Sequence, residues 1–274
     1  VALNQLARSA QGGAVLIATA EHEEGGLWNF VAHELSVADL EAGVVTRSSF
    51  NRRLAGGLDR AYLAPRPGHE GDAATTRTFP DSGGEDVVLI SSRHAGQIRL
   101  TSSRGDDVAG TWSPDGRLLV IQTDRWGHRS MSNLAIIDPQ STGTAPVRLT
   151  RGSNSRDTQP FWSPDGSRVA FIRTMFSTDS RESVRPTLCV VSVDGQHEEC
   201  LRTRSLTPQH IAGWASALDV IGRFVDTAGV PRIVVVNTET GQQRELAEAL
   251  GTFFVSHATG WIACYCRRST AEPF

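Results

Sequence analysis

Four cysteines are the side chains of this 274-residue chain whose spacing most directly suggests chemistry. Cys189 lies five residues before Asp194 and Cys200 lies five residues after Gly195, so the pair is symmetric about an Asp-Gly turn. In a two-residue hairpin the two cysteines would face each other on adjacent strands. Cross-strand Cβ atoms are about 4.5–5.5 Å apart or closer, and a disulfide needs about 3.5–4.5 Å. We expect either a disulfide, which implies an oxidising compartment, or two small buried thiols.

The other candidate sites for metal or catalytic chemistry are weak. Cys264 and Cys266 would point to one face of a strand, which favours packing over a zinc site. The acidic segment 21–24 could bind a metal, but no second cluster accompanies it, so we expect a solvated loop and no metal. We find no Gly-x-Ser-x-Gly elbow, His-Glu-x-x-His or phosphate loop, and we predict no catalytic residues and no cofactor in this chain.

A mixed aromatic and cationic segment, 125–129, has the composition of a recognition site. Trp126 offers a flat apolar face, while Arg125 and Arg129 offer charge-assisted donors on either side of it. The alternative is a plain exposed loop between two strands. Which interpretation holds depends on how the surrounding strands position this segment.

Those elements come from an internal repeat. The segment Thr111-Trp112-Ser113-Pro114-Asp115-Gly116 returns 50 residues later as Phe161-Trp162-Ser163-Pro164-Asp165-Gly166. Pro, Asp and Gly in this order form a tight turn, and an apolar strand follows each copy. A unit of this length that repeats is the signature of a repeat fold. The two tryptophans are therefore expected in the core of the repeat.

The repeat predicts an all-β fold, a β-propeller of four-stranded antiparallel blades with no helix longer than two turns. A second hairpin follows each Trp turn, so one unit holds four strands. We count five to six blades, the last one incomplete, in a single domain over 1–274. The copies lie at roughly 3–48, 57–101, 109–150, 160–202 and 211–246, with a partial copy at 252–274. In the second copy, 65–84 is interpreted as a loop.

The Trp-Ser-Pro-Asp-Gly turn, the apolar strand, the segment 124–127 and a closing Leu-Thr resemble the TolB-type WD-like propeller repeat. The same repeat builds the propeller domain of prolyl oligopeptidase and dipeptidyl peptidase relatives, and the segment 261–273 is similar to a part of those propellers. The resemblance covers most of residues 1–274. The resemblance implies the fold. It does not imply one function, because this repeat occurs in pumps, peptidases and binding proteins.

In a propeller, the loops after the second strands and the segments entering the first strands open on one face, around the channel. These are 21–29, 124–130, 176–185 and 226–231, together with 104–107, 154–158 and 204–210. The longest loop, 176–185, is either functional or a polar insertion. We predict that a ligand contacts Trp126 and Arg129 with at least one residue of 176–185. The candidate ligand-binding residues are Trp28, Asp124, Arg125, Trp126, His128, Arg129, Asp157, Asp179, Arg181 and Asp226.

Composition excludes some functions and leaves two. A net charge of −3 without a basic stretch argues against nucleic-acid binding, and no apolar run reaches the ~18 residues of a membrane span. The start at Val1 suggests a trimmed N-terminus. We expect a periplasmic or secreted, non-catalytic propeller that binds a protein or peptide at its channel mouth. The alternative is the substrate-gating propeller of a prolyl-oligopeptidase-type serine peptidase, with a hydrolase domain beyond Phe274.

Overall fold

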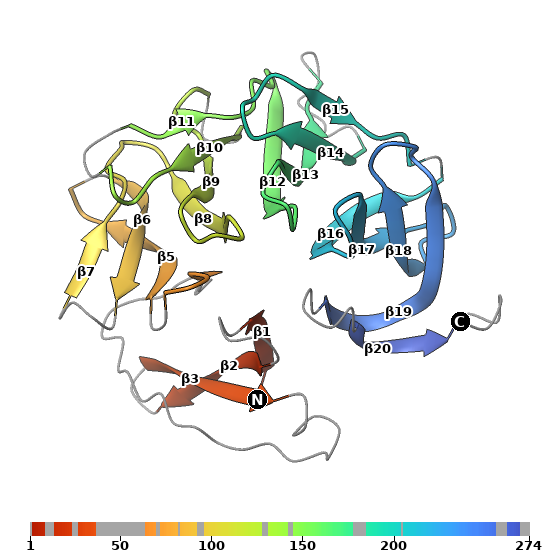
Figure 1. Cartoon of the computed structure of the whole chain (residues 1–274), viewed down its shortest axis with the longest axis horizontal. Coiled ribbons are helices and arrows are strands. Elements are labelled where there is room, and N and C mark those ends of the chain that lie inside the picture. Colours follow the sequence, from red (N-terminus) through yellow and green to blue (C-terminus); the bar gives the residue numbers. More distant parts are fainter. Residues whose placement is uncertain are drawn as a thin grey trace.

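The described residues of the computed structural model form five antiparallel sheets arranged around a common centre (Figure 1). The structure describes residues 2–8, 14–23, 27–36, 64–69, 72–81, 83–91, 96–127, 131–141, 145–177, 185–203, 205–255 and 262–268. Within these ranges it contains strands and turns and no helix, and hence no helix long and apolar enough to cross a membrane. The prediction of an all-β propeller is confirmed.

Each sheet uses strands that are consecutive in the chain. The first sheet holds β1 (Ala2–Arg8), β2 (Ala14–Glu23) and β3 (Leu27–Ser36), and the second holds β4 (Ala64–Pro65), β5 (Asp72–Phe79), β6 (Gly84–Ser91) and β7 (Gly96–Arg99). The third holds β8 (Asp107–Trp112), β9 (Leu119–Thr123), β10 (Asn133–Ile137) and β11 (Val147–Arg148). The fourth holds β12 (Ser155–Trp162), β13 (Arg168–Met175), β14 (Thr187–Ser192) and β15 (Glu198–Cys200). The fifth holds β16 (Thr207–Trp214), β17 (Asp219–Val225), β18 (Pro231–Asn237), β19 (Gln243–Val255) and β20 (Ile262–Arg268).

The Ser-Pro-Asp-Gly turns join the first and second strands by a shared set of hydrogen bonds. Ser113 Oγ donates to Asp115 Oδ1 at 2.6 Å and accepts the Leu118 N–H at 2.9 Å. Gly116 closes the turn with φ of 69°, in the left-handed region where glycine has no steric cost. The second copy, 163–168, repeats these contacts. The turn is thus a self-contained unit that fixes the hairpin locally.

The repeated tryptophans hold adjacent sheets together. Each indole is buried, and its Nε1–H donates to a backbone carbonyl on the first strand of the preceding sheet, which satisfies its polar atom. The pairs are Trp112 with Ala64 O at 2.8 Å, Trp162 with Thr111 O at 3.0 Å, and Trp214 with Phe161 O at 3.0 Å. The prediction that Trp112 and Trp162 belong to the core is confirmed.

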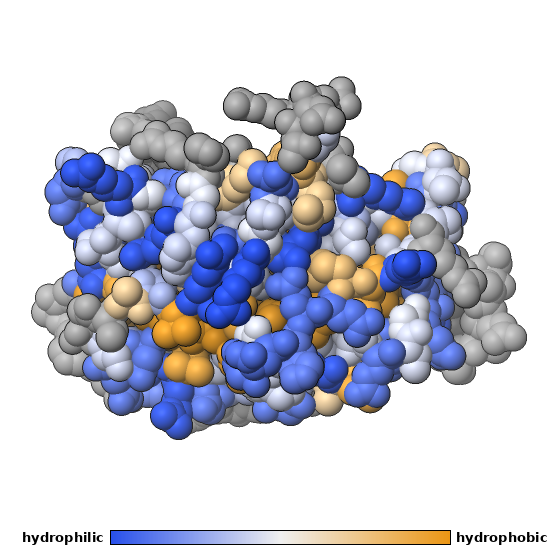
Figure 2. All heavy atoms as spheres, turned by 90° about the horizontal axis from the view of Figure 1, so that it is seen from above, coloured by the Kyte–Doolittle hydropathy of each residue, from blue (hydrophilic) through white to orange (hydrophobic). Residues whose placement is uncertain are grey.

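Apolar clusters fill the spaces between the second, third, fourth and fifth sheets. One cluster joins the second and third sheets, another the third and fourth, and another the fourth and fifth. The second and third strands of the third, fourth and fifth sheets therefore bury both faces, which explains their nearly continuous apolar sequence. On the side of the molecule seen in Figure 2, hydrophilic side chains predominate and apolar side chains gather in patches among them.

Three segments differ from the expected pattern. The loop expected at 21–29 is largely strand, because β2 continues to Glu23 and β3 begins at Leu27. The interpretation of 65–84 as a loop is wrong, because this stretch contains β5, which pairs with β6 along eight positions. Its buried residues are mostly Ala and Thr, so the small side chains concealed a strand that packs close to its neighbours. Near the C-terminus, β19 runs without interruption across position 252, and β20 pairs with it as the fifth strand of the last sheet.

Candidate functional site

The loops that follow the second strands lie beside the segments that enter the first strands. Within the third sheet, the Asp106 N–H donates to Asp124 Oδ1 at 2.8 Å. Between sheets, Ser132 forms an isolated parallel bridge with Arg156 of β12, and the Asp157 N–H donates to Ser132 O at 3.0 Å. We call the surface formed by 103–107, 124–127, 131–132, 154–157 and 175–177 the mouth face. It spans two adjacent sheets.

Trp126 is the exposed aromatic side chain of the mouth face. Its side chain is 40% exposed, and the Arg148 guanidinium stacks on the indole at 5.0 Å from the ring centroid. Arg148 is itself fixed, because it donates to Asn133 Oδ1 at 2.7 Å and to Thr150 O at 2.9 Å. The indole is therefore held on a rigid cation while much of its surface stays open to a partner.

A second apolar group lies on the adjacent sheet. Met175, at the end of β13, is 41% exposed, and Phe176 follows it with the Arg156 guanidinium 5.8 Å from its ring centroid. The Phe176 N–H donates to Asn154 O at 2.8 Å, which fixes the start of this loop. Trp126, Met175 and Val147 are the large apolar side chains that the described part of the chain exposes, and two of them lie on the mouth face.

The acidic residues predicted in this region bind groups of the protein itself. Asp124 is buried and holds the Asp106 N–H. Arg125 donates through Nη2 and Nε to the buried carboxylate of Asp107, at 2.6 Å and 3.1 Å. These contacts orient the loop that carries Trp126. They also engage Asp124 Oδ1 and Arg125 Nε and Nη2 with partners inside the protein.

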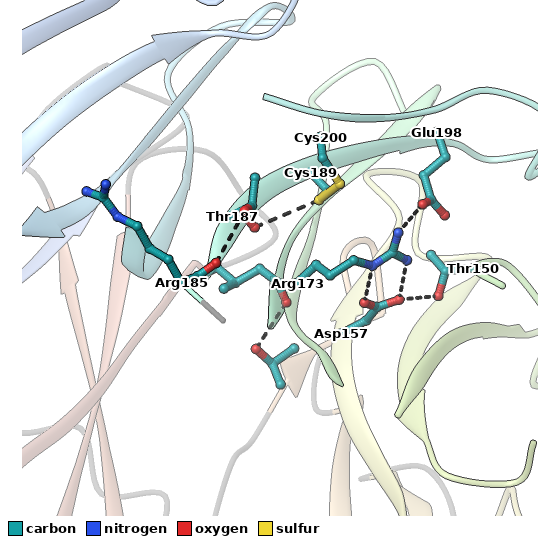
Figure 3. The surroundings of a disulfide bond; sticks show 10 residues. Thr150, Asp157, Arg173, Arg185, Thr187, Cys189, Glu198 and Cys200 are labelled. Atoms are coloured by element: carbon teal, nitrogen blue, oxygen red, sulfur yellow. Dashed lines mark hydrogen bonds and ion pairs between the residues drawn. A yellow bond between two sulfur atoms is a disulfide. The ribbon is translucent and has the colours of Figure 1, made fainter. Parts of the chain in front are cut away.

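Asp157 is the centre of a similar arrangement in the fourth sheet (Figure 3). Its buried carboxylate accepts two hydrogen bonds from Arg173, both at 2.7 Å, and one from Thr150 Oγ1 at 2.7 Å. Arg173 also pairs with Glu198 of β15. Burial acts to lower the pKa of Arg173, but its hydrogen bonds to the two carboxylates outweigh this effect and raise the pKa. Arg173 thus remains charged and fixes the end of β13.

Asp226 holds the turn between β17 and β18. Its Oδ1 accepts the N–H groups of Ala228 and Val230, both at 2.9 Å, and Arg232 donates to its other oxygen at 3.2 Å. The Val230 hydrogen bond is the largest cause that lowers the pKa of this carboxyl. Asp226 therefore stays ionised and shapes its own loop.

The remaining predicted residues lie outside the described part or are described by backbone alone. Trp28 is in β3, opposite His22 of β2. His128, Arg129, Asp179 and Arg181 fall outside the described residues. Across the ranges that the structure describes, no group of three or more His, Cys, Asp or Glu residues could hold a metal ion.

Sequence reasoning missed several groups that shape the mouth face. Arg148 and Met175 carry no motif, because one lies on a two-residue outer strand and the other ends a buried strand. Arg173 could have been found, because the third and fourth sheets share a pattern. Each has an Asp in its first strand that pairs with an Arg near the end of its second strand, Asp107 with Arg125 and Asp157 with Arg173. The predicted pair Cys189 and Cys200 is confirmed as a disulfide.

The sheets and their arrangement define a β-propeller, and the comparisons with known structures agree. The chain resembles a putative TolB from Agrobacterium tumefaciens with a TM-score of 0.64 and 18% identity, over 98% of this chain and 90% of that one. It resembles TolB from Acinetobacter baumannii with a TM-score of 0.54 and 14% identity, over 94% of this chain and 64% of the other. No family model matches the chain.

The same fold occurs as part of a longer enzyme. A puromycin-hydrolyzing peptidase from Mycobacterium tuberculosis matches with a TM-score of 0.58 and 15% identity. The match covers 88% of this chain but 37% of the peptidase. The chain therefore has the propeller fold shared by TolB and by the propellers of these peptidases.

Proposed function

We propose that this chain is a non-catalytic propeller that binds a protein or peptide on the mouth face. The observation that carries the proposal is the pair of exposed apolar side chains, Trp126 and Met175, on adjacent sheets. Each lies near an arginine stacked on an aromatic ring. Aromatic residues, Met and Arg are the residue types enriched where protein partners meet.

The fixed position of Trp126 adds to this argument. A side chain that must be ordered on binding costs about 0.5–1.5 kcal/mol. The stack on Arg148, together with the hydrogen bonds of Arg148, lowers that cost because the ring already has a fixed neighbour. Trp126 is therefore suited to act as the anchor residue of a specific interface rather than to bind partners non-specifically.

We place the protein outside the cytoplasm, in the periplasm or the extracellular space. The support is the disulfide between Cys189 and Cys200, because disulfides persist mainly in oxidising compartments. The similarity to TolB propellers is consistent with this proposal.

The binding proposal is tested with peptides selected from a random peptide display library on the wild-type chain. Trp126→Ala should lower the affinity for the selected peptides by about thirtyfold, since truncation of an anchor costs about 2 kcal/mol or more. Its melting temperature should stay nearly unchanged, because the side chain is 40% exposed. The matched control is Val147→Ala, an apolar and 70% exposed position on the outer strand of the same sheet. Equal binding by the Trp126 and Val147 variants would contradict the proposal.

The second candidate is the substrate-gating propeller of a prolyl-oligopeptidase-type serine peptidase. The structural similarity to puromycin hydrolases favours it, because the chain covers only 37% and 41% of two such proteins. The gene sequence after the Phe274 codon distinguishes the candidates. A hydrolase segment with a Gly-x-Ser-x-Gly elbow supports the peptidase, and a stop codon within one blade's length supports the binding protein.

A further inference from the structure

The disulfide of the fourth sheet ties down its outermost strand. Cys189 of β14 and Cys200 of β15 are directly paired in the antiparallel ladder. Cys189 is fully buried, whereas β15 is only three residues long and exposed along its whole length. The bond therefore links the core of the sheet to a short edge strand that is accessible from solvent.

An ion pair also connects the same edge strand to the mouth face. Glu198, two residues before Cys200, pairs with Nη1 of Arg173. Arg173 donates to both carboxylate oxygens of Asp157 (Figure 3). In the sequence, Arg173 lies two residues before Met175. A continuous series of contacts thus runs from the disulfide through β15 and Arg173 to the residues that end β13.

We propose that Cys189–Cys200 is a site of thiol–disulfide exchange with a dithiol reductant, and that its reduction loosens the mouth face through Glu198 and Arg173. A thiolate of the reductant attacks Cys200 Sγ, forms a mixed disulfide with it, and releases Cys189 as a thiolate that takes up a proton. The second thiolate of the reductant then closes the reductant's own disulfide and releases Cys200, which is protonated in turn. The protein gains two electrons and two protons, and the dithiol is oxidised to a disulfide.

The surroundings of Cys189 allow the sheet to survive this reaction. Its neighbours in the apolar cluster include Leu149 and Phe171, and a thiol packs in such a cluster as a small apolar group. Thr187 O lies 3.8 Å from Cys189 Sγ and can accept a hydrogen bond from the new thiol. The backbone bond from Leu201 N–H to Leu188 O, at 2.8 Å, also remains. The disulfide closes a short loop, with a sequence separation of 11, so it constrains the unfolded chain less than a long loop would.

Amide hydrogen exchange of the chain, oxidised and then reduced with dithiothreitol, tests the proposal without any ligand, so its outcome is independent of the proposed binding function. Reduction should speed exchange in 187–200 and in 173–177 by about fivefold or more, because the free energy of local opening decreases. Exchange in 119–123 and 133–137 of the third sheet should not change. Acceleration confined to 187–200 would overturn the proposal, and so would acceleration throughout the chain, which would make the disulfide a general staple.

A matched pair of variants isolates the charge link. Glu198→Gln in the oxidised chain should speed exchange in 173–177, because it weakens the contact with Arg173 while the disulfide keeps β15 in place. Glu199→Gln is the control, since successive residues of a strand point to opposite faces. If both variants behave like the wild type, Glu198 does not carry the link and the proposal is wrong.

Discussion

Replacement of Asp157 by Asn tests whether the buried carboxylates in the segments that form the mouth face stabilise the propeller. Asp157 is fully buried and receives two hydrogen bonds from Arg173 and one from Thr150. The amide of Asn has one acceptor oxygen, one NH2 group and no charge, so it can replace only one of the two oxygens that accept from Arg173. Arg173, which is 9% exposed, would then keep Glu198 as its charged partner.

The magnitude follows from this geometry. Removal of one partner from a buried ion pair costs about 3–5 kcal/mol, because the other charge is left uncompensated. The remaining contact with Glu198 places Asp157→Asn at the lower end, about 3 kcal/mol. For a domain of this size, 1 kcal/mol lowers the melting temperature by about 2–4 °C. We therefore expect a decrease of about 6–12 °C.

Thermal unfolding followed by circular dichroism measures this decrease, and urea unfolding gives the free energy. Glu239→Gln, at an exposed position, is the control and should change stability by less than about 0.5 kcal/mol. The double variant Asp157→Asn/Arg173→Met should be more stable than Asp157→Asn alone, because it leaves no buried charge unpaired. A loss below about 1 kcal/mol in Asp157→Asn, or a double variant that is less stable than the single one, would refute the reasoning.

The turns give two further predictions. Gly116→Ala should destabilise the chain more than Gly166→Ala, by about 1–3 kcal/mol. Both glycines have positive φ, but a Cβ at position 116 would lie 2.2 Å from Pro67 O, whereas the nearest atom at 166 is 3.6 Å away. Urea unfolding of the two variants measures the difference, and equal costs would contradict the packing argument. The pKa values of Asp115 and Asp165 are lowered from 3.8, chiefly by hydrogen bonds from the preceding serines. Their stabilisation is complete above 3.8 and is lost as the pH falls through the lower folded values, so Asp115→Asn/Asp165→Asn should flatten the fall in urea midpoint between neutral pH and about pH 3.

The repeat made the propeller predictable because its determinants are local. A Ser-Pro-Asp-Gly turn is fixed by hydrogen bonds within six residues, such as those among Ser113, Asp115 and Leu118, and can therefore be read from sequence. The symmetric spacing of Cys189 and Cys200 worked for the same reason, because the hairpin between them sets the register. The strand β5 was missed because its buried positions hold small side chains, whose suitability depends on the distance to the neighbouring sheet.

The candidate site was less predictable because residue type does not reveal which polar atoms are already engaged. The sequence identifies Asp124, Asp157 and Arg125 as groups able to bind a ligand, but each forms an ion pair or hydrogen bonds within the fold. Conversely, Met175 ends an apolar strand and has no pattern that marks it as exposed. Its exposure follows from its position at the end of β13 in the folded protein, which residue type alone does not reveal.

This distribution of contacts limits the kind of ligand that would fit the binding proposed for the mouth face. The carboxylates of Asp107, Asp124 and Asp157 are buried, so a cationic ligand would have to displace internal partners and leave Arg125 or Arg173 uncompensated. Such an exchange is costly because an unpaired buried charge costs several kcal/mol. The surface of Trp126 and Met175, by contrast, is available without breaking any of these contacts. Recognition through apolar and aromatic contacts therefore requires less free energy than recognition through these carboxylates. For this reason a Trp126 variant tests binding, whereas an Asp157 variant tests stability.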